Sequence, residues 1–155
     1  MNIILENSAQ VAWHTDMAAT LSALGVSPLD YDWYVSDFET NVPVPCLSEG
    51  DAWLTGQQLA DVIAEPVQFI WAVFSAVPAG ERSEFSSAPS ADSNPSFWQA
   101  PEVSVQMPGA HFEVVCWDSS ATLLIGVSDV QAAQFSRTYS DAKPLSSAWA
   151  GAAER

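Results

Sequence analysis

The sequence predicts an α+β fold, with a mostly antiparallel five-stranded sheet and about three helices packed on one face. Three observations predict it. Five segments have the alternating or continuous apolar pattern of strands, and three others have the pattern or the capping residues of helices. Two connections between expected strands, Pro108-Gly109 and residues 118–120, are so short that only antiparallel pairing fits them. Elements in this order form a sheet with helices layered against it.

The first helix is expected over residues 8–24, because large apolar residues recur there at spacings of four, four and three from Trp13 to Leu24. Gly25 provides a natural C-terminal end. The first strand is expected at residues 31–38, which are rich in aromatic side chains and alternate in polarity.

The middle of the chain predicts a short helix and a buried strand. Thr55 and Gln58 have the spacing of a capping box, which begins a helix that extends to about residue 64. The segment Val67–Val77 is apolar on both faces, a pattern typical of a central strand covered on both sides or of a strand at an association surface.

The last third predicts three strands and a helix. The strands are expected at residues 102–107, 111–117 and 121–127, and the first two alternate in polarity. Ser128 and Gln131 form a second capping-box spacing, which begins a helix that extends to about residue 139.

The chain length of 155 residues fits one domain, and 7 Trp, 7 Phe and 3 Tyr supply the side chains for its core. We expect a single domain over residues 1–145 with a flexible loop at about 79–100, where a Ser- and Pro-rich stretch has almost no large apolar residue. The Ala- and Ser-rich end, residues 146–155, is expected to be a frayed tail.

The charge of the chain restricts its function. Nineteen acidic residues stand against four basic ones, which gives a formal net charge of −15. Such a chain repels nucleic acids and anionic membranes and attracts basic protein surfaces, although acidic surfaces also simply keep proteins in solution. No signal-peptide pattern opens the sequence, and the longest apolar run is about half the length of a membrane-spanning helix. We therefore expect a cytoplasmic protein that binds neither nucleic acid nor membrane.

Residues with reactive side chains form no motif that specifies a reaction. His14 and Asp16 would point apart on a helix, and His111 stands alone at the start of an expected strand. Cys46 and Cys116 are far apart, so we expect two reduced thiols and no disulfide. The sequence therefore predicts no catalytic residue, no metal site, no cofactor and no enzymatic activity.

The densest acidic region, residues 30–51, also carries aromatic residues. Carboxylates steer the association of basic proteins, and aromatic side chains anchor interfaces. We therefore predict a partner-binding surface here, while half-buried aromatic residues of an ordinary strand are the alternative. The predicted partner-binding residues are Asp30, Asp32, Trp33, Tyr34, Asp37, Glu39, Glu49 and Asp51.

Several segments resemble a small family of acidic bacterial proteins, some of them assigned as immunity proteins beside polymorphic toxins. The resemblance rests on residues 112–125 and the helix that leads to 141–145, on Trp33-Tyr34-Val35, and on residues 70–74. It implies a cytosolic protein that neutralises a cognate basic toxin, such as a nuclease, by binding it. It transfers no site residue to this chain.

Two other functions remain open on the sequence. The acidic surface could mimic nucleic acid and inhibit an enzyme that acts on DNA or RNA. Alternatively, Val67–Val77 and Trp98 could form an association surface that makes a structural homo-oligomer.

Overall fold

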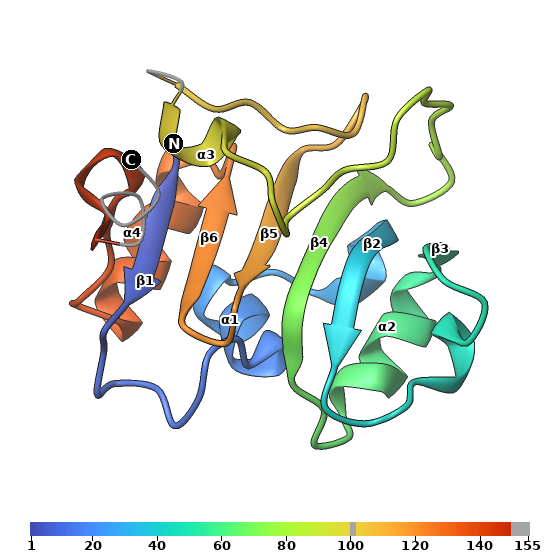
Figure 1. Ribbon diagram of the computed structural model, residues 1–155, viewed down its shortest axis with the longest axis horizontal. Helices are drawn as coiled ribbons and strands as arrows, with labels where there is room; N and C mark the ends of the chain where they lie inside the picture. The colour runs from blue at the N-terminus through green and yellow to red at the C-terminus, as the bar shows by residue number, and fades with distance from the viewer. Residues whose placement is uncertain (100–101, 150–155) are drawn as a thin grey trace.

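The computed structural model describes residues 1–99 and 102–149, which form a seven-stranded antiparallel sheet with helices against it (Figure 1). The strand order is β3-β2-β4-β5-β6-β1-β7, and every neighbouring pair is antiparallel. The predicted α+β class is confirmed, but the sheet has more strands than the five expected. The strands are β1 (Ile3–Glu6), β2 (Tyr31–Thr40), β3 (Ala52–Leu54), β4 (Phe69–Pro78), β5 (Phe112–Trp117), β6 (Ala121–Ile125) and β7 (Lys143–Pro144).

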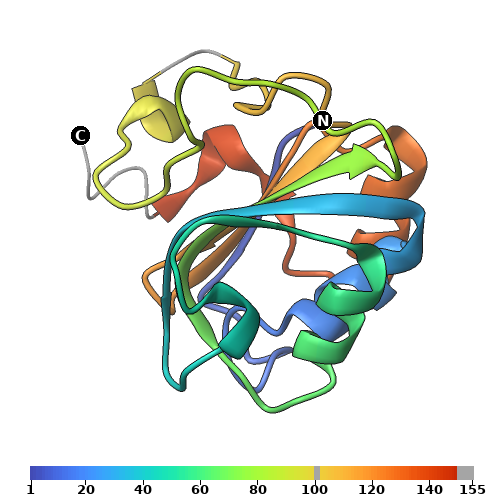
Figure 2. The ribbon, with the colours of Figure 1, turned by 90° about the vertical axis from the view of Figure 1, so that its right-hand side faces the viewer.

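Three helices cover one face of the sheet, as expected (Figure 2). They are α1 (Met17–Leu24), α2 (Gly56–Ile63) and α4 (Asp129–Thr138). Both predicted capping boxes are present, at α2 and at α4. In each, the N-cap hydroxyl accepts the backbone N–H of the glutamine three residues later, and the side chain of that glutamine accepts the backbone N–H of the N-cap residue. A one-turn helix, α3 (Ser96–Gln99), lies over the opposite face.

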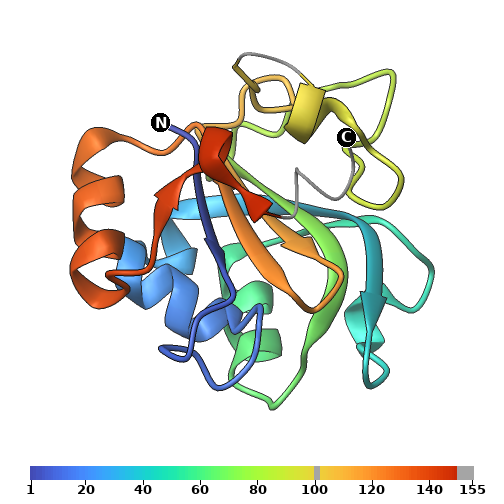
Figure 3. The same cartoon turned by 60° about the vertical axis from the view of Figure 1, so that its left-hand side comes forward.

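The predicted helix over residues 8–24 is wrong in its first half, because α1 begins only at Met17. Asp16 is its N-cap, and the Asp16 carboxylate accepts a hydrogen bond from the backbone N–H of Ala19 at 3.1 Å. Upstream, Ile3–Glu6, which begins with three apolar residues, forms β1 between β6 and β7 (Figure 3). The sequence predicted no strand there.

The predicted strand at residues 102–107 is also wrong. These residues belong to a long connection, residues 79–99 and 102–110, that crosses the sheet face opposite the three helices and is called the strap below. The backbone N–H groups of Gln106 and Met107 donate to the carboxylate of Glu113 and not to a neighbouring strand. The Glu113 side chain thus accepts the backbone hydrogen bonds that a neighbouring strand would have accepted in a sheet.

The core has two main parts, one on each face of the sheet. Phe112, Val114 and Cys116 of β5 face the helices, whereas Val115 and Trp117 face the strap, as the alternation predicts. On the strap face the Trp117 ring packs edge-on against that of Trp98, with centroids 4.9 Å apart. β4 is covered on both faces, so Val67–Val77 contributes a central strand.

The end of the described chain packs beside β1. Residues Leu145–Ser147 form a 3-10 turn, and Ala148 is buried. The backbone N–H of Trp149 donates to the carboxylate of Glu6. The rest of the expected frayed tail, residues 150–155, lies outside the described residues.

Candidate functional site

The two aromatic residues predicted to bind a partner lie in the core. Trp33 has no exposed surface, and its indole N–H donates to the carbonyl of Pro28 at 3.0 Å. Tyr34 points to the strap face and is 9% exposed, with its ring between those of Trp53 and Phe85 at centroid distances of 5.2 and 4.8 Å. Both rings therefore stabilise the fold and offer almost no surface to another molecule.

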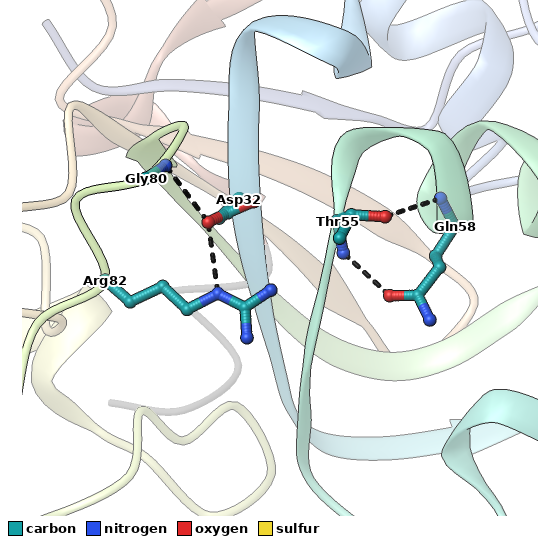
Figure 4. A network of polar contacts seen from close by, with 5 residues as sticks. All are labelled: Asp32, Thr55, Gln58, Gly80 and Arg82. Atoms are coloured by element: carbon teal, nitrogen blue, oxygen red, sulfur yellow. Dashed lines mark hydrogen bonds and ion pairs between the residues drawn. The ribbon is translucent and has the colours of Figure 1, made fainter.

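Asp32 is also engaged within the chain. It is 9% exposed, and one carboxylate oxygen accepts the backbone N–H of Gly80 at 3.2 Å and Nε of Arg82 at 3.0 Å (Figure 4). The Arg82 guanidinium also lies 5.4 Å from the ring of Trp53. Asp32 thus fixes the start of the strap, and its charge is balanced by Arg82.

Asp37 forms a second contact between β2 and the strap, and it is hydrogen-bonded to two other acidic residues. One of its oxygens accepts the backbone N–H groups of Ala91 at 2.7 Å and Asp92 at 2.9 Å. Its own N–H donates to the carboxylate of Asp51 at 3.0 Å. The backbone of Asp37 has a φ of +49°, and the β2–β4 register shifts between Ser36 and Glu39. This bulge brings three segments distant in the sequence together.

The acidic edge, defined here as Asp37, Glu39, Glu49, Asp51 and Asp92, lies where β2 continues beyond the short strand β3. Glu39, Glu49, Asp51 and Asp92 are exposed. Asp30 is exposed too, but it precedes the ten-residue β2 and lies at the opposite end of that strand. The structure therefore joins two of the eight predicted residues, Asp37 and Asp51, directly, and Glu39 and Glu49 lie two positions along the chain from them. It adds Asp92, whose backbone N–H donates to Asp37 and which the sequence reasoning missed because it lies in the strap.

The cations of the described residues do not neutralise the acidic edge. Arg82 pairs with Asp32, and Lys143 pairs with Glu6 at 3.1 Å. Arg137 lies in the last turn of α4, which packs on the sheet face covered by the three helices. Across residues 1–99 and 102–149, no ion pair involves a member of the acidic edge. Four of its five acidic residues are exposed to water.

Glu113 is a buried carboxylate beneath the strap that the sequence reasoning did not single out. It is 1% exposed and accepts hydrogen bonds from the N–H of Gln106 at 2.6 Å, the N–H of Met107 at 3.0 Å and the hydroxyl of Ser75 at 2.6 Å. Burial raises its pKa, and the three hydrogen bonds act in the opposite direction. The sequence did contain a signal for this buried carboxylate, because Glu113 is the one charged residue in the otherwise apolar segment Phe112–Trp117.

Two other reactive groups, Cys116 and His14, have pKa values that burial shifts. Burial raises the pKa of the Cys116 thiol to about 12, so the nucleophilic thiolate does not form at neutral pH. Burial also lowers the pKa of His14. Within the described part of the chain, no three His, Cys, Asp or Glu side chains are placed to hold a metal ion. No described helix combines the length and apolar character needed to cross a bilayer.

A groove lies between α2 and the loop that leads to Glu49 and Asp51. The proline-rich loop at residues 42–46 and the outer face of α2 enclose a cavity of about 310 Å³. A second cavity, of about 260 Å³, borders the first at Glu65 and Val67 and extends to Trp13 and Asp16. With this geometry described, comparisons of the chain with protein-family models, curated proteins and solved structures found no match.

Proposed function

We propose that this chain is a non-enzymatic binding protein of the immunity type, which neutralises a basic protein toxin in the cytoplasm by covering it. The observation that carries the proposal is the acidic edge, where acidic residues of β2, the loop before β3 and the strap meet at Asp37 and, among the described residues, form no ion pair with a cation. Fifteen net negative charges make a basic protein the natural partner class.

The electrostatics of the acidic edge support binding more than stability. Like charges held close together repel one another and destabilise the isolated protein, and a cationic partner would remove that repulsion on contact. Such complementarity acts mainly on the association rate, because the field orients the partner before contact. Glu39, Glu49, Asp51 and Asp92 are the contact residues of the proposal, while Asp32, Trp33 and Tyr34 support the surface from within.

A nucleic-acid mimic is the second candidate, and the spread of acidic residues favours it. Exposed carboxylates also lie on α4, at the β5–β6 turn and before β7, as in Asp129, Asp118 and Asp141. A mimic would present charge over a long surface and compete with DNA or RNA for an enzyme. Self-association through Val67–Val77 has less support, because β4 is central in the sheet and Trp98 is 4% exposed.

The test is an affinity capture from native host lysate at low and high salt, followed by kinetics with the purified partner. Because steering can raise association rates by 10- to 10³-fold, we expect the E39Q/E49Q variant to associate roughly tenfold more slowly at low salt. The D129N/D141N variant removes the same charge from the start of α4 and from the residues before β7, at the other end of the strand order. It should change the association rate little.

Two outcomes contradict the proposal. An equal loss in both variants would mean that total charge matters and the acidic edge does not, as a mimic predicts. Capture of acidic or neutral proteins alone would remove the basic partner from the proposal.

A further inference from the structure

The lining of the groove beside α2 combines apolar and acidic residues. Loop and helix residues line the 310 Å³ cavity, and most of its lining is apolar. Val42 is 43% exposed, although it is a large apolar residue. Four valines line the cavity, Val42, Val44, Val62 and Val67, together with the acidic residues Asp61 and Glu65.

The walls of the groove are fixed before any partner arrives. Pro43 and Pro45 restrict the loop, and Asn41 joins it to the residue before β4 through two hydrogen bonds with Gln68, at 2.8 and 3.1 Å. On the other side, the capping box of Thr55 and Gln58 fixes the start of α2 (Figure 4). A preformed groove does not lose binding energy to the ordering of its own walls.

The charges at this end of α2 are arranged unfavourably for the isolated chain. A helix C-terminus carries partial negative charge and is stabilised by cations, but the last turn of α2 has no basic residue. Asp61 lies in that turn instead, and Glu65 lies two residues beyond the end of the helix, both exposed. Asp61 accepts a hydrogen bond from the neutral Gln57 amide at 2.9 Å and forms no ion pair within the described residues. This end of the groove therefore attracts a positive charge that the described residues do not supply.

The shape of the groove suits a stretch of polypeptide. Its two cavities meet at Glu65 and Val67, and the second adds the carboxylate of Asp16 and the ring of Trp13 to the lining. The proline-rich loop that forms one wall continues directly to Glu49 and Asp51. The groove and the acidic edge are thus joined through one loop.

We propose that this groove binds a cationic peptide segment of the basic partner, with an apolar side chain inserted between the loop valines and Val62 and with Lys or Arg beside Asp61 and Glu65. The inference rests on the proposed function and adds a second contact surface to it. It specifies the chemistry of the segment, which is basic residues next to an apolar anchor.

The test uses two synthetic peptides and backbone amide chemical shifts. One peptide consists of Lys and Leu, and the other has Ser in place of every Leu. We expect the Lys/Leu peptide to shift the amides of Val42, Val44 and Cys46 and those of residues 61–65 and 67, and to bind several-fold more tightly than the Lys/Ser peptide. The D61N/E65Q variant should bind the Lys/Leu peptide several-fold more weakly than the wild type, whereas D129N/D141N should bind it with unchanged affinity. The V44T/V62T variant, which changes polarity at almost constant volume, should abolish the preference for Leu.

The outcomes separate this inference from the proposed function. Shifts confined to Glu39, Glu49, Asp51 and Asp92 would overturn the groove and leave the acidic edge as the binding surface. Equal affinity for the two peptides would also overturn it, because the valines that line the groove would then play no part. Binding in the groove together with capture of a partner that is not basic would leave the groove in place and refute the proposed function.

Discussion

At the scale of single residues, Glu113 is the most informative carboxylate, because it joins two strands to the strap without reaching solvent. Its folded pKa is raised above the ordinary value of 4.5 by burial. The folded chain therefore holds this proton more tightly than the unfolded chain does. The resulting contribution to stability is fully present below the unfolded pKa and is lost as the pH rises through the folded pKa.

The variant E113Q, which cannot titrate, tests this sign. We expect the free energy of unfolding of the wild type, minus that of E113Q, to fall as the pH rises from about 4.5 through the raised pKa. The slope is up to about 1.4 kcal/mol per pH unit while the two states differ by one proton. Above that range E113Q should still be less stable, by about 1–3 kcal/mol, because its amide N–H₂ meets a backbone N–H. Urea unfolding at several pH values measures the difference. A pH-independent difference would contradict the assignment.

At the scale of elements, the two capping boxes show what local sequence can predict. The N-cap and N3 residues of α2 and α4 are three positions apart, so the sequence alone places these helix starts. We expect Thr55→Ala to lower the free energy of unfolding by about 1 kcal/mol. Thr55→Ser, which keeps the hydroxyl, should lower it much less. Thermal unfolding of both variants gives the comparison, and equal losses would show that the hydroxyl does not stabilise α2.

Elements defined by distant partners could not be predicted in this way. β3 and β7 have three and two residues, too few for a periodic pattern, and each exists only because a neighbouring strand supplies the ladder. The predicted site differs from the observed one for the same reason, because contacts between residues far apart in the sequence decide which acidic residues are free. The acidic density near β2 was visible in the sequence, but the partner of Asp32 is Arg82, 50 positions away. Asp92 joins the acidic edge from 55 positions beyond Asp37.

At the scale of the whole molecule, the excess of carboxylates sets the response to salt. Net charge far from zero destabilises a compact chain through self-repulsion, and salt at 0.1 M screens charges beyond about 10 Å. We therefore expect the melting temperature to rise between very low salt and about 0.15 M NaCl and then to level off. Each kcal/mol of relieved repulsion should raise it by roughly 2–4 °C for a chain of this size.

Variants of the acidic edge connect this response to binding. E39Q/E49Q should melt at a higher temperature than the wild type at very low salt and should show a smaller rise on addition of NaCl, because part of the repulsion is already gone. The same variant should associate more slowly with a basic partner, so stability and association rate change in opposite directions. D129N/D141N removes equal charge elsewhere, but it also removes the acidic residue from the first turn of α4 and weakens the acceptor of the Ser8 hydroxyl. The change of melting temperature with salt, and not its absolute value, therefore separates total charge from its concentration at the acidic edge. A larger gain in stability for D129N/D141N would place the strongest repulsion away from the acidic edge and would weaken the case that its carboxylates are held together for a partner.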